Sequence, residues 1–220
     1  MKKIVWVFGE SATGKKTLID KLSNHDEEVL NTFNMNNKKI VTSEITLKDN
    51  SSYIDVIDNN FYDDSLMDED NLYFSREKAK RRRSYILHDV DKFINGNSDI
   101  LLIKGQINDL RINRGNTINY FLKKYSDMKD LQIEVILLKV DDENELKRRL
   151  ENKSWFKRIE DENEKVRLRK DLLLKQKAHI EEVINTFSDY NVPITIYESL
   201  DNSYQYDGII NEKRIKTRNI

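Results

Sequence analysis

The sequence contains no cysteine, a single proline and almost no net charge. Without cysteine, the protein has no disulfides, thiolate metal sites or cysteine nucleophile. The 38 Lys and Arg residues nearly balance the 39 Asp and Glu residues, so wholesale binding to a nucleic-acid backbone has no electrostatic basis. No apolar run approaches the roughly 20 residues needed to cross a bilayer, and Ile4–Phe8 is too short for the core of a signal peptide. We therefore expect a soluble, cytoplasmic protein that does not bind a membrane.

Apolar strands alternate with helices along the 220 residues, which is typical of an α/β protein. The β-rich runs predicted as strands are Ile4–Phe8, Lys39–Thr42, Asp99–Ile103, Ile133–Val140 and Ile194–Tyr197. Apolar residues at helical spacing predict helices between them, including Lys15–Ser23, Asn116–Tyr125 and roughly Asp161–Phe187. This order predicts βαβ units and hence a doubly wound, mainly parallel sheet in one domain of residues 1–220.

The segment between the first strand and the next helix is Gly9-Glu10-Ser11-Ala12-Thr13-Gly14-Lys15-Lys16-Thr17, here named the glycine loop. Glycines five apart followed by Lys match the Walker A pattern G-x-x-x-x-G-K-[ST] up to its last position. The glycines allow a turn tight enough for successive backbone N–H groups to face one anion, and the next helix points its N-terminus at the same phosphate. We therefore predict that this loop binds a nucleoside triphosphate and that Lys15 reaches its β- and γ-phosphates as a catalytic residue. The alternative is an ordinary turn that joins a strand to a helix.

The last position of the pattern departs from it, because Lys16 stands where a hydroxyl residue normally binds Mg²⁺. A second cation cannot ligate the metal. The hydroxyl comes one residue later, so Thr17 is the candidate metal contact, with an α-phosphate oxygen as its alternative and favoured partner. Mg²⁺ retains water readily, so waters, a carboxylate and the phosphates themselves can also hold it. The departure weakens the expectation of turnover more than the expectation of binding.

The chain resembles the nucleoside- and nucleotide-kinase branch of the P-loop NTPases, which also includes polynucleotide kinases and kinases of small metabolites. At the level of motifs the resemblance is specific only for Gly9–Thr17. It implies a single P-loop kinase-like domain with a five-stranded parallel sheet and a helical lid rich in arginine. The matching run covers about residues 147–165 and includes Arg148 and Arg149, which in such a lid stabilise the transferred phosphoryl group and exclude water. The alternative is a solvated helix face with charge pairs such as Glu145 with Arg149.

Polar residues just past the third strand are candidates for binding the phosphate acceptor. Gln106, Arg111 and Arg114 lie where open α/β sheets bind ligands, beyond the carboxyl end of a strand. We predict that they bind the acceptor, the two arginines through its phosphate or carboxylate. The alternative is an ordinary solvated loop rich in Asn and Arg. The strand leads into Lys104-Gly105-Gln106 and not into the acidic residue of a Walker B motif, and Asp109 is the nearest substitute.

A kinase that phosphorylates a hydroxyl needs a carboxylate near the end of the second strand. Glu44 is in that position, with Asp55 and Asp58 as nearby alternatives. An acceptor that is already a phosphate needs no strong base, and the assignment then loses its purpose. Near the other end of the chain, Tyr204 and Tyr206 precede a basic tail at about residues 211–220. They either stack on a nucleic acid or form a packed edge, and we favour the packed edge.

The features together predict an ATP-dependent phosphotransferase, a kinase that uses ATP or GTP with Mg²⁺. Its acceptor is a small molecule, a nucleotide or a nucleic-acid end. The alternative, from a different class, is a nucleotide-binding regulatory or interaction protein with little turnover. Lys16 and the missing Walker B acid both favour that alternative.

Overall fold

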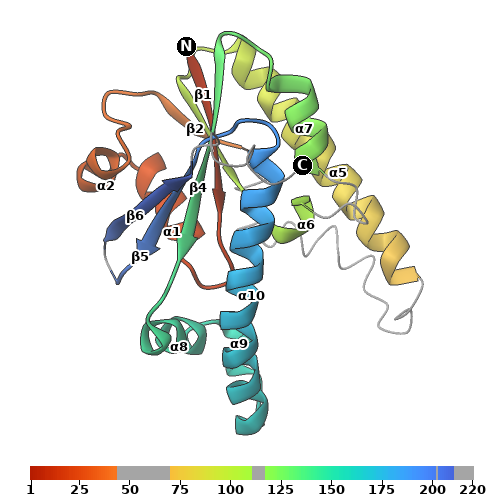
Figure 1. The fold of residues 1–220 in the computed structure, drawn as a ribbon, viewed down its shortest axis with the longest axis vertical. Coiled ribbons are helices and arrows are strands. Elements are labelled where there is room, and N and C mark those ends of the chain that lie inside the picture. The colour runs from red at the N-terminus through yellow and green to blue at the C-terminus, as the bar shows by residue number, and fades with distance from the viewer. Residues whose placement is uncertain (44–69, 111–116, 202, 211–220) are drawn as a thin grey trace, which may run out of the picture. The chain divides into compact units, whose positions relative to one another are not determined.

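The computed structural model describes residues 1–43, 70–110, 117–201 and 203–210. It is an α/β structure with a six-stranded, mostly parallel sheet in the order β2-β3-β1-β4-β5-β6 (Figure 1). The strands are β1 (Lys2–Phe8), β2 (Ile40–Thr42), β3 (Ile100–Lys104), β4 (Leu131–Lys139), β5 (Ile194–Ser199) and β6 (Tyr204–Ile210). No helix in these described ranges is long and apolar enough to cross a membrane.

The predicted strands all form, and the apolar residues of β1 from Ile4 to Phe8 are completely buried, as expected for an inner strand. The expectation of a five-stranded parallel sheet is wrong, because β6 adds a sixth strand that pairs antiparallel with β5. At the ends of the two strands, the Leu200 N–H donates to the Ser203 carbonyl at 3.0 Å. This strand was missed because it is polar and half-exposed, as an edge strand can be.

The two tyrosines of β6 both contact aromatic rings, as the favoured packed edge requires, although Tyr206 is 56 % exposed. The ring of Tyr204 lies edge-on to Phe33 at 5.4 Å between centroids, and Tyr206 lies edge-on to Tyr197 at 6.0 Å. These rings therefore pack against neighbouring aromatic side chains of the fold.

The chain divides into two compact units, and the first contains residues 1–5 and 37–133. Here β2 runs parallel to β3, with Ile40 opposite Ile100. The helices are α5 (Asp70–Asn95), α6 (Ile107–Leu110) and α7 (Thr117–Tyr125). Helices α5 and α7 lie side by side (Figure 1), joined by Asp91, which accepts hydrogen bonds from Lys124 at 2.9 Å and from the Tyr125 hydroxyl at 2.7 Å.

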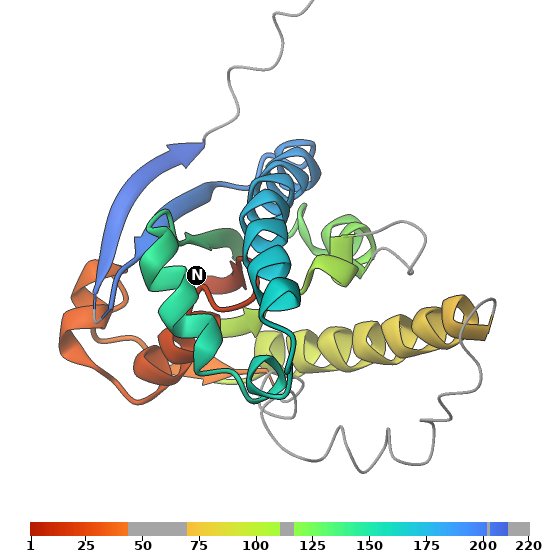
Figure 2. The same ribbon diagram turned by 90° about the horizontal axis from the view of Figure 1, so that it is seen from below.

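The second unit contains residues 6–36 and 134–220. Its helices are α1 (Lys15–Ser23), α2 (Glu27–Thr32), α8 (Glu143–Glu151), α9 (Ser154–Lys157) and α10 (Glu162–Ser188). The long helix α10 matches the predicted Asp161–Phe187, since Asp161 is its N-cap and accepts from the Asn163 N–H. Figure 2 shows α8 and α10 on either side of the segment that follows β1. The glycine loop and the whole predicted lid region therefore belong to one unit.

Candidate phosphate-binding site

The backbone of the glycine loop adopts conformations that few residues tolerate. Gly9, Ala12 and Gly14 have φ values of 144°, 67° and 88°. Gly14 is the left-handed N-cap of α1, and Lys15 is the first residue of that helix. The N–H groups of a first helical turn have no acceptor within the helix. The loop therefore ends on a group of backbone donors at the positive end of the α1 dipole.

Gly9 also sits where no side chain fits. A Cβ atom there would lie 2.5 Å from the Leu138 carbonyl oxygen and 2.5 Å from the Thr13 hydroxyl oxygen. Backbone on one side and the loop itself on the other leave no room for adjustment. The first glycine is therefore required both by its φ angle and by the close approach of β4.

Lys15 folds back onto the loop that precedes it. Its ammonium group donates to the Gly9 carbonyl at 2.5 Å and to the Glu10 carbonyl at 2.8 Å. The Glu10 carbonyl also accepts from the Thr13 N–H at 3.3 Å and from the Thr13 hydroxyl at 2.9 Å. The positive charge of Lys15 is thus held at the loop, on neutral carbonyl groups.

The side chain of Glu10 links the loop to α10, which sequence reasoning missed. Its Oε1 accepts from the Ser11 N–H at 2.9 Å, and its Oε2 lies 3.2 Å from His179 Nδ1. The hydrogen bond from His179 lowers the pKa of Glu10, aided by the Ser11 N–H and by the charge of Lys15. No short-range pattern could have paired these residues, which are 169 positions apart.

Lys16 and Thr17, the residues at the altered metal position, are both exposed on the first turn of α1. Among the residues whose placement is described, no group of three or more His, Asp or Glu side chains is arranged to hold a metal ion. Thr17 as a metal contact therefore stays a prediction.

An apolar cluster packs around Ala12 of the glycine loop. The Ala12 side chain packs with Leu146 and Leu150 of α8, Phe156 of α9 and Leu172 of α10. Phe156 is fully buried there. The predicted lid region is thus packed onto the loop through its apolar residues.

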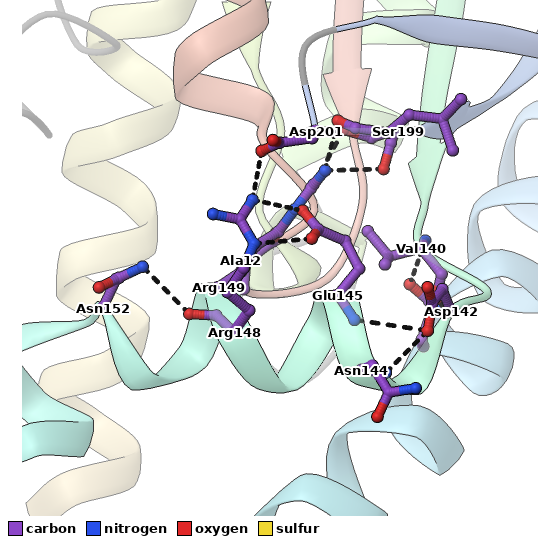
Figure 3. Close-up of polar contacts among 12 residues, drawn as sticks. Ala12, Val140, Asp142, Asn144, Glu145, Arg148, Arg149, Asn152, Ser199 and Asp201 are labelled. Carbon is purple, nitrogen blue, oxygen red and sulfur yellow. Dashed lines mark hydrogen bonds and ion pairs between the residues drawn. The ribbon is translucent and has the colours of Figure 1, made fainter.

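Arg149 on α8 lies beside the glycine loop with all five of its N–H groups engaged (Figure 3). Nε donates to Glu145 at 2.5 Å, and Nη1 donates to the Ser199 hydroxyl at 2.9 Å and the Ala12 carbonyl at 3.5 Å. Nη2 donates to the carbonyls of Ser199 at 2.8 Å and Leu200 at 2.5 Å. Its side chain is only 14 % exposed. Arg149 therefore ties together α8, the end of β5 and the loop.

Its neighbour Arg148 points to solvent, with 52 % of its side chain exposed. Figure 3 shows its guanidinium between Glu145 on the same helix and Asp201 after β5. Hydrogen bonds from Arg148 and then Arg149 lower the pKa of Glu145 to about 2. The predicted pairing of Glu145 with Arg149 forms, so α8 carries both a charge-paired face and an arginine at the loop.

The predicted acceptor residues are described only in part. Glu44, Arg111 and Arg114 lie outside the described residues. Gln106 follows β3, and its N–H donates to Asp109 Oδ2 at 2.9 Å.

The carboxylate of Asp109 is fully engaged within the first unit. It is almost completely buried and accepts from Arg82 Nε at 2.8 Å and from Arg82 Nη2 at 3.0 Å, in addition to the Gln106 N–H. Arg82 Nη2 also donates to the Lys104 carbonyl at 2.6 Å. The nearest substitute for a Walker B acid is therefore part of a buried ion pair that fixes the corner after β3.

A scan of the chain against protein-family models gives no match, and a search of curated proteins gives none either.

Proposed function

We propose that the chain is a P-loop phosphotransferase that binds a nucleoside triphosphate, ATP or GTP, at the glycine loop. The observation that carries the proposal is the conformation of the loop, with Gly9 and Gly14 at positive φ immediately before the first turn of α1. Backbone donors, a helix dipole and one lysine then converge on a single anion.

Lys15 supplies the mobile part of the binding charge. Its ammonium group is bonded to two carbonyls of the same loop, so exchanging them for phosphate oxygens needs only a rotation of the side chain. At the phosphates it offsets the charge that develops during phosphoryl transfer. Of the two lid arginines, Arg148 and Arg149, Arg149 lies nearer the loop, since its Nη1 is 3.5 Å from the Ala12 carbonyl oxygen. It is therefore the better candidate for contact with the bound phosphates. Arg148 acts only if its ion pairs with Glu145 and Asp201 open.

The residues of the loop fit the phosphates better than they fit the metal. Magnesium, when bound with the triphosphate, screens the charge of the phosphate oxygens. Thr17 is the residue of the loop that offers a hydroxyl, and Lys16 offers none. The phosphates and water then supply most of the ligands, as Mg²⁺ commonly allows.

The test is a binding and turnover assay with ATP and GTP, each with Mg²⁺. Pooled nucleosides, nucleotides, 5′-hydroxyl oligonucleotides and small metabolites serve as acceptors, and release of the nucleoside diphosphate is followed. Lys15→Ala should remove both binding and turnover, whereas Lys129→Ala, at an exposed lysine far along the chain, should change neither. Glu44→Gln should spare binding and reduce turnover. Failure of the wild-type protein to bind either triphosphate would refute the proposal.

A second candidate function is a nucleotide-binding regulatory or interaction protein with little turnover. It is favoured by the exposed Lys16 at the metal position and by Asp109, whose carboxylate is committed to Arg82. The same assay separates the two functions. Tight triphosphate binding without acceptor-stimulated release of diphosphate would replace the kinase by this alternative.

A further inference from the structure

A buried histidine on α10 contacts the glycine loop through the first residue after Gly9. His179 is 3 % exposed, and its ring lies edge-on to Phe8 at 6.2 Å between centroids. Its Nδ1 lies 3.2 Å from Glu10 Oε2, while the other carboxylate oxygen of Glu10 is held by the Ser11 N–H. Both oxygens of this carboxylate are therefore engaged, one by the loop and one by α10.

The carboxylate of Glu10 fixes which nitrogen of His179 carries the proton. A carboxylate accepts hydrogen bonds and does not donate them, so Nδ1–H must be the donor. The lowered pKa of Glu10 agrees with an ionised acceptor. The other ring nitrogen, Nε2, is buried, and within the described part of the chain it makes no hydrogen bond. If the residue served only to fill this space, Phe would be more stable here, because Phe leaves no polar atom buried without a partner.

The helix that carries His179 is itself bonded to Val140, the residue that follows β4. Gln176, one helical turn earlier on α10, is buried and bonds both to the Val140 N–H and to the Val140 carbonyl at 3.0 Å. Residues three apart on a helix share a face. His179 is thus a donor at a fixed position, and Glu10 is held from outside the loop.

The charge of Glu10 makes its position matter for an anionic ligand. The Glu10 carboxylate belongs to the same loop as Lys15, whose ammonium lies 2.8 Å from the Glu10 carbonyl. The charge of Lys15 helps to lower the pKa of this carboxyl group. A free Glu10 carboxylate competes with phosphate for Lys15 and for the backbone donors, and it repels the phosphate directly. Holding both of its oxygens prevents that competition.

We infer that His179 is a positioning residue for triphosphate binding, which holds the Glu10 carboxylate so that Lys15 and the loop N–H groups other than that of Ser11 stay available to phosphate. This inference rests on the proposed function of the loop. His179 acts through Glu10 and does not itself contact the ligand.

The experiment is a double-mutant cycle on the full chain, with the Kd for ATP and for GTP measured by calorimetry. The variants are His179→Phe, which keeps the ring and removes the donor, Glu10→Gln, and the two combined. His179→Gln, which keeps a donor, tests rescue, and His88→Gln, at an exposed histidine, is the control. Because a hydrogen bond to a charged group is lost, His179→Phe should weaken binding about tenfold. In the Glu10→Gln background the same substitution should cost less than about twofold, since no carboxylate is left to hold.

The outcomes separate this inference from the proposed function. Unchanged binding by His179→Phe, or equal weakening in both Glu10 backgrounds, overturns the positioning role and leaves the triphosphate site standing. Absence of triphosphate binding by the wild-type protein overturns both. If His179→Phe fails to fold, long-range proton–nitrogen correlation spectra of the wild-type protein still decide the matter. They should show His179 protonated at Nδ1 near neutral pH, and a ring protonated only at Nε2 overturns the inference.

Discussion

Two neighbouring arginines on α8 offer a matched test of how the glycine loop is held. We predict that Arg149→Met destabilises the protein and that Arg148→Met does not. Both side chains donate to Glu145, but Arg149 is 14 % exposed and Arg148 is 52 % exposed. Arg149 in addition satisfies the carbonyls of Ser199 and Leu200, which methionine cannot do.

The magnitude follows from what each substitution leaves behind. Removing Arg149 leaves a carboxylate and backbone carbonyls short of a donor at a mostly buried position, and a hydrogen bond with a charged partner contributes about 1.5 to 3 kcal/mol. Allowing for the partial exposure of Arg149, we expect a loss of about 2 kcal/mol, or a fall in Tm of about 4 to 8 °C for a chain of this length. Exposed ion pairs such as those of Arg148 contribute little and are screened by salt. Arg148→Met should therefore leave Tm close to that of the wild type.

The assay is thermal unfolding followed by circular dichroism, at low and at high salt. Arg149→Lys is a useful third variant, since it keeps the charge but loses the planar fork, and it should recover only a small part of the lost stability. The stabilising role of Arg149 is refuted if Arg149→Met unfolds at the same temperature as Arg148→Met. It is also refuted if high salt removes the difference between them, because a buried network is screened much less than a surface pair.

Two further predictions concern the loop and the helix beside it. Gly9→Ala should lower the free energy of unfolding by about 3 kcal/mol and weaken triphosphate binding, because its Cβ would lie 2.5 Å from a backbone carbonyl oxygen at a φ of 144°. Gly208→Ala, where a Cβ meets nothing within 4 Å, is the control and should be near neutral in urea unfolding. Glu145 has its pKa lowered from 4.5 to about 2, so its full contribution to stability is present above pH 4.5 and is lost as the pH falls toward 2. Glu145→Gln should flatten the decline in Tm over that range, and an unchanged slope would contradict the assignment.

The sequence predicted the strands of the sheet interior because they are continuous apolar runs, a strong local signal. It did not predict β6, where Gln205, Asp207 and Gly208 interrupt the pattern and pairing with β5 decides the conformation. The contact of Glu10 with His179 could not be predicted from the sequence, for a different reason. It depends on two residues brought together by the fold, and neither stands out in its own segment.

The different environments of Arg148 and Arg149 could, in contrast, have been predicted from their angular positions around the helix. Leu146 and Leu150 define the buried stripe of α8. At about 100° per residue, Arg148 lies about 180° from the centre of that stripe, and Arg149 lies about 80° from it. The phase therefore places Arg149 at the margin of the core, while its actual partners, mostly backbone oxygens, carry no signature in the sequence.

The glycine loop is held in its conformation by several elements of its own unit before any ligand arrives. β4 approaches Gly9, the apolar cluster takes up Ala12, Arg149 bonds the Ala12 carbonyl, and His179 holds Glu10. A loop ordered in advance loses little conformational entropy when it binds, so more of the interaction energy with phosphate appears as affinity. The exposed side of α1, where Lys16 stands, has no comparable support from the residues described around it. The described contacts therefore order the proposed phosphate-binding loop and not the position of Lys16, which favours the proposal of triphosphate binding over that of metal-dependent turnover.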